Sequence, residues 1–280
     1  MRFLKAHASG NDFIVSYIEE SEEYDFSAIS QKICDRHFGI GANGLVVLSN
    51  LNPQESKVKF RIFNSDGSEA EVSGNGLKCA SAFLIFKGLV KGKIISFSTL
   101  AGERKCELIG RVNNTFNLKV YMGVPRFSSD DVSFNDGNKY EMIVDYPLTI
   151  GQRTYQVTCI SLGNPHCAVF FNKFPSTIEW QQIGKEIESH PFFTKKANVE
   201  LVRVLNKNEI EVLFWERGVG ESFSSGSGSC ASALSAMIKG LVERKVKVKT
   251  RAGEQIVEWL DDGVYLTGPC EIICEGEWLG

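Results

Sequence analysis

Hydrophobic and polar residues alternate along this chain in short runs that predict many β-strands and few helices. Seven such runs are VKFRIF, KIISFST, FNLKVYM, YQVTCI, HCAVFF, EIEVLFW and VKVKTRAG, and a period of about two residues is typical of strands. Four windows have helical spacing instead: residues 26–37, 75–90, 179–189 and 227–243. With two of these windows in each half, the pattern predicts a strand-rich α/β (α+β) protein.

An internal repeat accompanies this pattern. The stretch FNSDGSEAEVSGNGLKCASA resembles FWERGVGESFSSGSGSCASA, and ASGNDF resembles SLGNPH. Ser225 lies 152 residues after Ser73, and Asn164 lies 153 residues after Asn11. Two independent matches at nearly one offset indicate an ancient duplication. We therefore expect two pseudo-symmetric domains, with the crossover near MGVPRF at 122–127, where Pro125 interrupts strand pairing.

Composition narrows the classes of partner. A chain of 280 residues suits two domains, and a net charge of −3 without a basic run argues against a nucleic-acid partner. No stretch approaches 18 uncharged apolar residues, so we expect no membrane partner. The opening MRFLKAHASGND turns polar within seven residues and lacks the apolar segment of a secretory signal. A cytoplasmic protein is the expectation.

The eight cysteines are scattered and include no C-x-x-C pair. A disulfide scaffold belongs to shorter secreted chains, and a zinc site needs closely spaced ligands. We therefore expect most of these cysteines to be small buried hydrophobic residues and expect no metal site.

Both copies of Ser-Gly-x-Gly are predicted to open a helix. The backbone N–H groups at 74–76 and 226–228 then lack intrahelical acceptors and favour an anion. If the two halves face each other across a cleft, both helix ends converge on one carboxylate, with Ser73 and Ser225 on opposite sides of the neighbouring carbon. This geometry suits inversion of a stereocentre, which needs one group to remove a proton and another to deliver one. A hydroxyl is a poor base for this purpose compared with a thiol, whose pKa is about 8.5.

At these residues the chain resembles the diaminopimelate epimerase family over nearly its whole length. The resemblance rests on KAHASGNDFIV, DRHFGIGANGLVVL, FNSDGSEAEVSGNGLKCASAF, LGNPHCAVF, KANVELV, WERGVGESFSSGSGSCASAL and LTGPCEIICEGE, which follow in the family's order. It implies a cofactor-independent isomerase that interconverts LL- and meso-diaminopimelate, a precursor of lysine and peptidoglycan. It also implies domains at 1–123 plus 269–280 and at 124–268, each with strands around a central helix, and a homodimer.

The resemblance also assigns roles to individual residues. Ser73 and Ser225 would occupy the two proton-transfer positions, Glu216 would accept from the substrate ammonium, and Asn11 and His166 would line the pocket beside the reacting carbon. The remaining substrate contacts divide between the reacting carboxylate, held by Gly74, Asn75, Gly226 and Ser227, and the distal carboxylate, held by Asn64, Asn164, Asn198 and Arg217. Taken singly, Arg217 also fits a solvated surface pair, His166 a loop histidine, and the asparagines turn formers.

The chain departs from the family where chemistry is expected. The family has Cys at both proton-transfer positions, usually Thr where Ser227 stands, and Asp where Asn43 stands. Deliberate Cys→Ser replacement and natural divergence both explain the serines, and serine is abundant throughout the second motif. Takeover by Cys79 and Cys230 is disfavoured, because these lie roughly 8 Å along their helices from the anion site. Under either explanation we expect diaminopimelate binding with very slow or absent epimerisation.

Other readings stay open. Within the same superfamily the alternatives are a proline or hydroxyproline racemase and a phenazine-biosynthesis-type isomerase; Arg217, Asn64 and Asn198 favour a substrate with a second carboxylate. From a different class, the double serine fits a catalytically inactive diaminopimelate-binding protein. A pyridoxal phosphate racemase is disfavoured, because no lysine lies beside a phosphate-binding Gly-rich turn.

Overall fold

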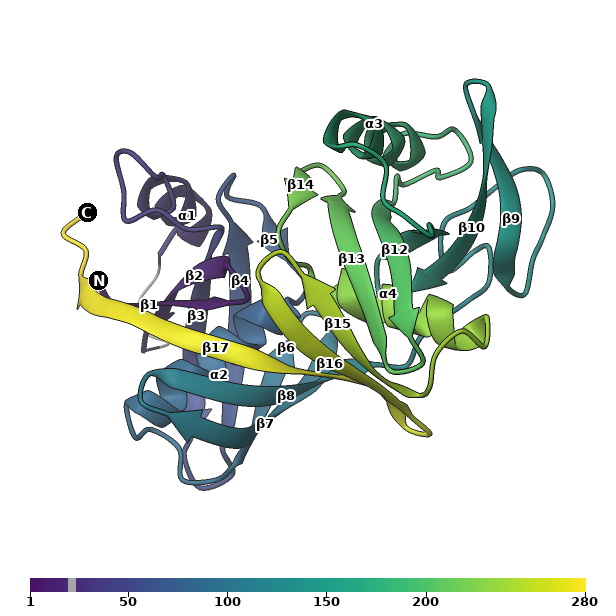
Figure 1. Ribbon diagram of the computed structural model, residues 1–280. Helices are drawn as coiled ribbons and strands as arrows, with labels where there is room; N and C mark the ends of the chain where they lie inside the picture. The colour runs from purple at the N-terminus through teal and green to yellow at the C-terminus, as the bar shows by residue number, and fades with distance from the viewer. Residues whose placement is uncertain (20–23) are drawn as a thin grey trace. The chain divides into compact units, whose positions relative to one another are not determined.

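Strands are the predominant secondary structure in the computed structural model, which describes residues 1–19 and 24–280 (Figure 1). The chain forms two units, residues 1–121 with 267–280, and residues 122–266. Each unit combines a curved sheet with two helices, so the expected strand-rich α+β fold is confirmed.

The first unit contains helices α1 (Phe26–Ile33) and α2 (Gly74–Phe86). Its strands are β1 (Arg2–Ala8), β2 (Asn11–Tyr17), β3 (Gly44–Asn52), β4 (Lys57–Asn64), β5 (Glu69–Ala70), β6 (Ile94–Thr99), β7 (Gly102–Val112), β8 (Thr115–Gly123) and most of β17 (Gly263–Glu277). The second unit contains helices α3 (Thr177–Glu188) and α4 (Gly226–Ile238). Its strands are β9 (Ile143–Ile150), β10 (Arg153–Ser161), β11 (Pro165–Phe170), β12 (Asn198–Asn206), β13 (Glu209–Glu216), β14 (Gly220–Ser222), β15 (Lys245–Thr250) and β16 (Gly253–Leu260).

The two units share one pattern of strand pairing. In the first, β1–β2 is antiparallel, β2–β3 parallel, β3–β4 and β4–β5 antiparallel, β4–β6 parallel and β6–β7 antiparallel. The second repeats these six pairings, in the same order and sense, from β10–β11 to β15–β16. Helices α1 and α3 occupy matching crossovers, as do α2 and α4. This agreement confirms the pseudo-symmetry expected from the repeat.

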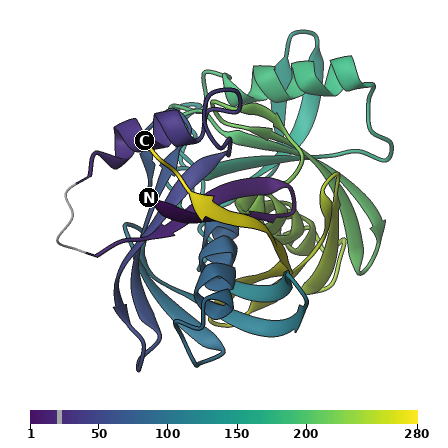
Figure 2. The same cartoon turned by 90° about the vertical axis from the view of Figure 1, so that its left-hand side faces the viewer.

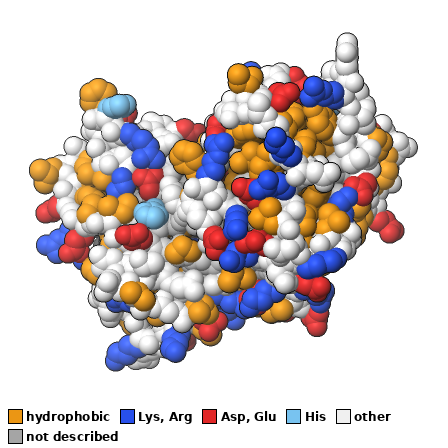
Figure 3. All heavy atoms as spheres, viewed as in Figure 1, with side chains coloured by type: hydrophobic (Ala, Val, Ile, Leu, Met, Phe, Trp, Pro, Cys, Tyr) orange, Lys and Arg blue, Asp and Glu red, His pale blue; other side chains and the backbone are white. Residues whose placement is uncertain are grey.

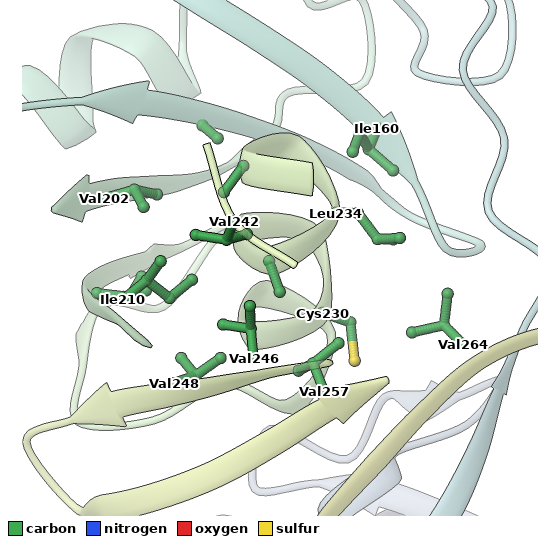
Figure 4. Close-up of a cluster of buried hydrophobic side chains, with 14 of the residues drawn as sticks. Ile160, Val202, Ile210, Cys230, Leu234, Val242, Val246, Val248, Val257 and Val264 are labelled. Carbon is green, nitrogen blue, oxygen red and sulfur yellow. The ribbon is translucent and has the colours of Figure 1, made fainter. Parts of the chain in front are cut away.

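Each unit is built around its small-residue helix. Every residue of α2 from Asn75 to Leu84 is buried, and the helix packs against strands of its own unit, including β1, β2, β3 and β7 (Figure 2). Helix α4 is covered in the same way by β10 to β13 and by β15 and β16. Cys230 and Leu234 of α4 point into a cluster of aliphatic side chains from these strands (Figure 4). Ala, Ser and Gly recur in both helices and dominate α4, because small side chains let the surrounding strands approach closely.

All four expected helices end earlier in the structure than in the sequence prediction, one of them by a single residue and three by four or five residues. The windows 75–90 and 227–243 overran α2 and α4, which terminate at Gly88 (φ +66°) and Gly240 (φ +67°). In each case the next residue donates its N–H to the carbonyl five residues earlier, at 2.9 Å, which is a Schellman ending. The window 26–37 overran α1, because the Asp35 carboxylate accepts from the N–H groups of His37 and Phe38 and forms a turn instead.

Other sequence expectations concern cysteines, charge and membranes. All eight cysteines are free thiols and seven are buried, as expected. Acidic and basic side chains are interspersed on the face shown in Figure 3. Among the described residues, no helix is long and apolar enough to cross a membrane. No group of His, Cys, Asp and Glu side chains within 1–19 and 24–280 is arranged to hold a metal ion.

Candidate active site

Ser73 caps the N-terminus of α2. Its backbone is extended (φ −140°, ψ 123°), and its Oγ accepts from the N–H of Gly76 at 3.1 Å. The N–H groups of Gly74 and Asn75 have no acceptor among the described residues. A Cβ on Gly76 would lie 3.0 Å from Ile62 Cδ1 and 3.2 Å from Ser73 Cβ, so a larger residue would be crowded here. The result is an open pair of N–H groups at the positive end of a helix beside a serine hydroxyl.

Ser225 caps α4 in nearly the same conformation. Its φ and ψ are −133° and 127°, and its Oγ accepts from the N–H of Gly228 at 3.2 Å. In the part of the chain that the structure describes, the N–H groups of Gly226 and Ser227 also lack acceptors. Both copies of Ser-Gly-x-Gly therefore open a helix, as the sequence predicts, and each leaves two N–H groups without an acceptor among the described residues.

The two hydroxyls differ in their second hydrogen bond. Ser225 Oγ donates to Glu216 Oε2 at 3.2 Å, whereas no acceptor for the Ser73 proton lies among the described residues. The pairings β4–β5 and β13–β14 align Asn64 with Glu216 across the repeat. Asn64 is exposed, and its amide donates to Ser68 Oγ at 2.9 Å. Among the described residues, a carboxylate therefore accepts from the hydroxyl in the second unit and not in the first.

Asn198 fixes the segment that follows Glu216. Its Oδ1 accepts from the Arg217 N–H at 2.9 Å, and its Nδ2 donates to the Pro165 carbonyl at 3.1 Å. The Arg217 side chain is exposed, and its Nη1 donates to the Lys195 carbonyl at 3.0 Å. Asn198 thus uses its amide to hold the loop, and one N–H of Nδ2 remains for a ligand.

His166 lies beside Asn198 in the register of β11 and β12. Its Nδ1 is 2.6 Å from Glu200 Oε1 and its Nε2 is 3.0 Å from Asn164 Oδ1. The His166 and Glu200 side chains are each only 1% exposed. Burial raises the pKa of Glu200, and the neighbouring His166 opposes that rise. The ring is therefore held between the Glu200 carboxylate and the Asn164 amide.

Asn11 and Asn64 occupy strand ends of the first unit. Ser9 and Gly10 both have positive φ (51° and 78°), so they form the tight turn that delivers Asn11 at the start of β2. Asn43 connects the segments that carry Asn11 and Asn64. Its N–H donates to the carbonyl of Asp12 at 2.9 Å, and its own carbonyl accepts from the N–H of Ser65 at 3.2 Å.

Hydrogen bonds and chain adjacency bring most of the candidates in the second unit together. Ser225, Glu216, Arg217, Asn198, His166 and Asn164 form one connected set, which Gly226 and Ser227 continue along α4. In the first unit, Ser73, Gly74 and Asn75 form one group at α2, and Asn11 and Asn64 form another at the strand ends.

Cys79 does not replace the missing thiol. It is fully buried, its Sγ lies 3.7 Å from Cys270 Sγ, and burial raises its pKa well above the ordinary value for a thiol. Because the thiolate is the reactive form, this environment makes Cys79 a packing residue.

Comparison with known proteins assigns the chain to a family. The family model described as diaminopimelate epimerase matches residues 3–128 and 158–273. Diaminopimelate epimerase of Pelotomaculum thermopropionicum is 38% identical over 281 residues, covering 99% of each chain. That of Caldanaerobacter subterraneus is 39% identical over 278 residues, again covering 99% of each. The chain belongs to the diaminopimelate epimerase family.

The fold is shared more widely than the sequence of this family. A probable proline racemase from Agrobacterium radiobacter superposes with a TM-score of 0.71 at 13% identity, covering 99% of this chain and 92% of the other. A hydroxyproline epimerase from Agrobacterium vitis gives 0.68 at 14% identity, with 99% and 90% coverage. These likenesses show that this member of the diaminopimelate epimerase family shares its overall fold with both proteins.

Two carboxylates of this family member, Glu200 and Glu188, contact the candidate site residues or their loop but are not among the residues predicted from the sequence. Glu200 stands in the apolar strand run NVELV, and such a charge inside a buried strand signals a paired group. Glu188 ends α3 and is buried against the loop that follows β13. The sequence signal for this contact was weak: Glu188 follows the apolar face of a predicted helix, which places it near the protein interior.

Proposed function

We propose that this chain binds 2,6-diaminopimelate and transfers the α-proton between the two faces of the carbon, with Ser73 and Ser225 as the transferring groups. The observation that carries the proposal is the matched pair of serine-capped helices, each with two open N–H groups. The reaction requires both serines to reach one α-carbon from opposite faces when substrate is bound. Each unit, descended from one copy of the duplicated domain, would then supply one of the two proton-transfer groups.

The roles of the other groups follow from their chemistry. The open N–H groups at Gly74, Asn75, Gly226 and Ser227 would hold the reacting carboxylate, whose negative charge grows as the proton leaves. Removal of that proton by Ser225 Oγ would pass the hydroxyl proton to Glu216, and the other hydroxyl would donate its proton to the opposite face.

Recognition of the far end of the substrate would fall to amide and guanidinium groups. We assign Asn64, Asn164, Asn198 and Arg217 to the distal carboxylate, since a planar guanidinium and amide donors suit a carboxylate. Asn11 and His166 would line the pocket beside the reacting carbon, and Glu216 would also accept from the substrate ammonium. Such polar contacts discriminate strongly against a substrate that lacks the second charged end.

The serines set the expected rate. An alcohol is a much weaker base than a thiol, so we expect binding with very slow epimerisation. The test follows deuterium incorporation from solvent at the α-carbon by NMR. The double substitution Ser73→Cys, Ser225→Cys should accelerate exchange roughly 10²- to 10⁴-fold. Rapid exchange in the unsubstituted protein would contradict the expected rate, and no measurable binding of diaminopimelate would overturn the proposal.

A catalytically inactive diaminopimelate-binding protein is the second candidate, and the paired serines favour it. Tight binding with zero turnover in the double cysteine protein would select this function. Competition between diaminopimelate and proline would separate both candidates from a proline racemase.

The proposal extends to location and assembly. We propose a cytoplasmic protein without a nucleic-acid or membrane partner, as its composition predicts, and a homodimer, as the family resemblance implies. Light scattering after size-exclusion chromatography tests the dimer, and a mass corresponding to one chain would contradict it.

A further inference from the structure

The loop that carries Glu216 and Arg217 is held by hydrogen bonds to one buried carboxylate, that of Glu188. Glu188, the last residue of α3, is 8% exposed. Its Oε2 accepts from Trp215 Nε1 at 2.7 Å, and its Oε1 accepts from the N–H of Gly218 at 2.9 Å. The two donors come immediately before and immediately after the Glu216–Arg217 pair, so a single side chain brackets the dipeptide.

Packing keeps α3 and this loop in close contact. A Cβ on Gly184 would lie 2.8 Å from both Cβ and Cγ of Trp215, so the helix backbone contacts the indole directly. Gly218 has φ +76°, which permits the turn that aims its N–H at Glu188. Lys196 Nζ lies 3.6 Å from Glu188 Oε1 and balances the charge.

The corresponding loop of the first unit is also held by its crossover helix, but by neutral groups. Ser30 Oγ donates to the Asn64 carbonyl at 2.8 Å, and Gln31 Nε2 donates to the Asp66 carbonyl at 2.7 Å. In the second unit the loop supplies the donors and the helix supplies the acceptor. Charge-assisted hydrogen bonds are roughly twice as strong as neutral ones, so the second loop is held more firmly.

We propose that Glu188 is a positioning residue that sets the placement of Glu216 and Arg217 for substrate binding. This inference rests on the proposed function, which assigns those two residues to the substrate. Glu188 acts through the loop: without its carboxylate, the Trp215 indole and the Gly218 N–H lose their acceptors, and the intervening residues lose their fixed geometry.

The experiment compares Glu188→Gln with Glu186→Gln, the same chemical change on the same helix at a side chain that accepts from Gln182, also in α3. Hydrogen–deuterium exchange of the peptide covering 214–222 reads the loop directly. We expect at least 10-fold faster exchange there in Glu188→Gln, unchanged exchange in α4, and wild-type behaviour in Glu186→Gln. Trp215→Phe, which keeps an aromatic ring against α3 and removes one donor, should give a smaller increase of about 3-fold.

Calorimetric titration with meso-diaminopimelate reads the consequence for binding. Glu188→Gln should bind at least 10-fold more weakly, and Glu186→Gln within 2-fold of the wild type. Unchanged loop exchange in Glu188→Gln would overturn the positioning role, and so would accelerated exchange with unchanged affinity. Failure of the wild type to bind would overturn the proposed function, and loop exchange alone would then decide whether Glu188 fixes the loop.

Discussion

Ser225 Oγ donates to Glu216 Oε2 at 3.2 Å, and within residues 1–19 and 24–280 this bond has no counterpart at Ser73. The duplicated sequence placed the same capping serine in both units, whereas the residue aligned with Glu216 is an asparagine. Two hydroxyls with the same backbone geometry therefore have unequal access to a base.

The substitution Glu216→Gln, made in the Ser73→Cys, Ser225→Cys protein, tests whether the Glu216 carboxylate contributes to proton transfer at position 225. Loss of a hydrogen bond to a charged group costs about 1.5–3 kcal/mol, so α-deuterium exchange should slow by roughly 10- to 100-fold. The control is Glu209→Gln, at the opposite end of β13, where the carboxylate pairs with Lys249. Equal rates in the two variants would contradict the role of Glu216.

His166→Phe should destabilise the second unit through the carboxylate it leaves behind. The variant buries Glu200 without its partner, which costs about 3–5 kcal/mol in the free energy of unfolding. Adding Glu200→Leu removes the orphaned carboxylate and should recover much of the loss. Urea denaturation of both single variants and the double variant measures the coupling. A double variant no more stable than His166→Phe would contradict this account.

Asp12→Asn should lower stability by about 2–3 kcal/mol at pH 7. Asp12 accepts from Arg36 Nη2 at 2.8 Å and Nη1 at 3.2 Å, and Lys5 Nζ lies 3.3 Å away. Burial alone would raise the pKa of Asp12, but Arg36 and then Lys5 hold it below the usual range. Its ionised form therefore stabilises the fold above pH ~4, and the benefit is lost as pH falls through the depressed pKa.

The matched control is Glu69→Gln. Glu69 accepts two hydrogen bonds from Arg61, at 2.7 and 2.9 Å, on the surface of the first unit. Solvent screens that pair, so its loss should cost less than about 1 kcal/mol. Denaturation at pH 7 and pH 3 distinguishes the two sites: the difference between wild type and Asp12→Asn should shrink at the lower pH. A constant difference would rule out the ionised Asp12 as its source.

Gly228→Ala should destabilise the α4 end of the site. The added Cβ would lie 2.9 Å from Phe214 Cδ1 and 3.0 Å from Glu200 Oε1. Overpacking of this kind costs about 1–3 kcal/mol, which the better helix propensity of alanine, about 1 kcal/mol, offsets only in part. Gly110→Ala, where no heavy atom lies within 4 Å of the new Cβ, is the control and should leave the melting temperature nearly unchanged. Similar melting temperatures for both variants would contradict the steric argument.

Local sequence signals predicted the elements and their duplication but not all of their limits. The Ser-Gly-x-Gly motif correctly placed both helix starts, because a serine cap and small residues act within one turn. The C-terminal ends of α2 and α4 were wrong by several residues. Apolar residues continue past Gly88 and Gly240, as Leu89 and Val90 and as Leu241 and Val242, and only the positive φ of those glycines shows where helical hydrogen bonding stops.

The sequence by itself determined the two-fold repeat, the strand-rich composition of each half and the two serine-capped helices, because these depend on residues close together in the chain. Only the tertiary structure decided that Glu200 is buried against His166 and that Glu188 accepts hydrogen bonds from Trp215 and from the loop that follows it. Those contacts join residues 34 and 27 positions apart, respectively. A carboxylate is tolerated inside a protein only where folding supplies its donors, and no local pattern specifies which distant residues those are.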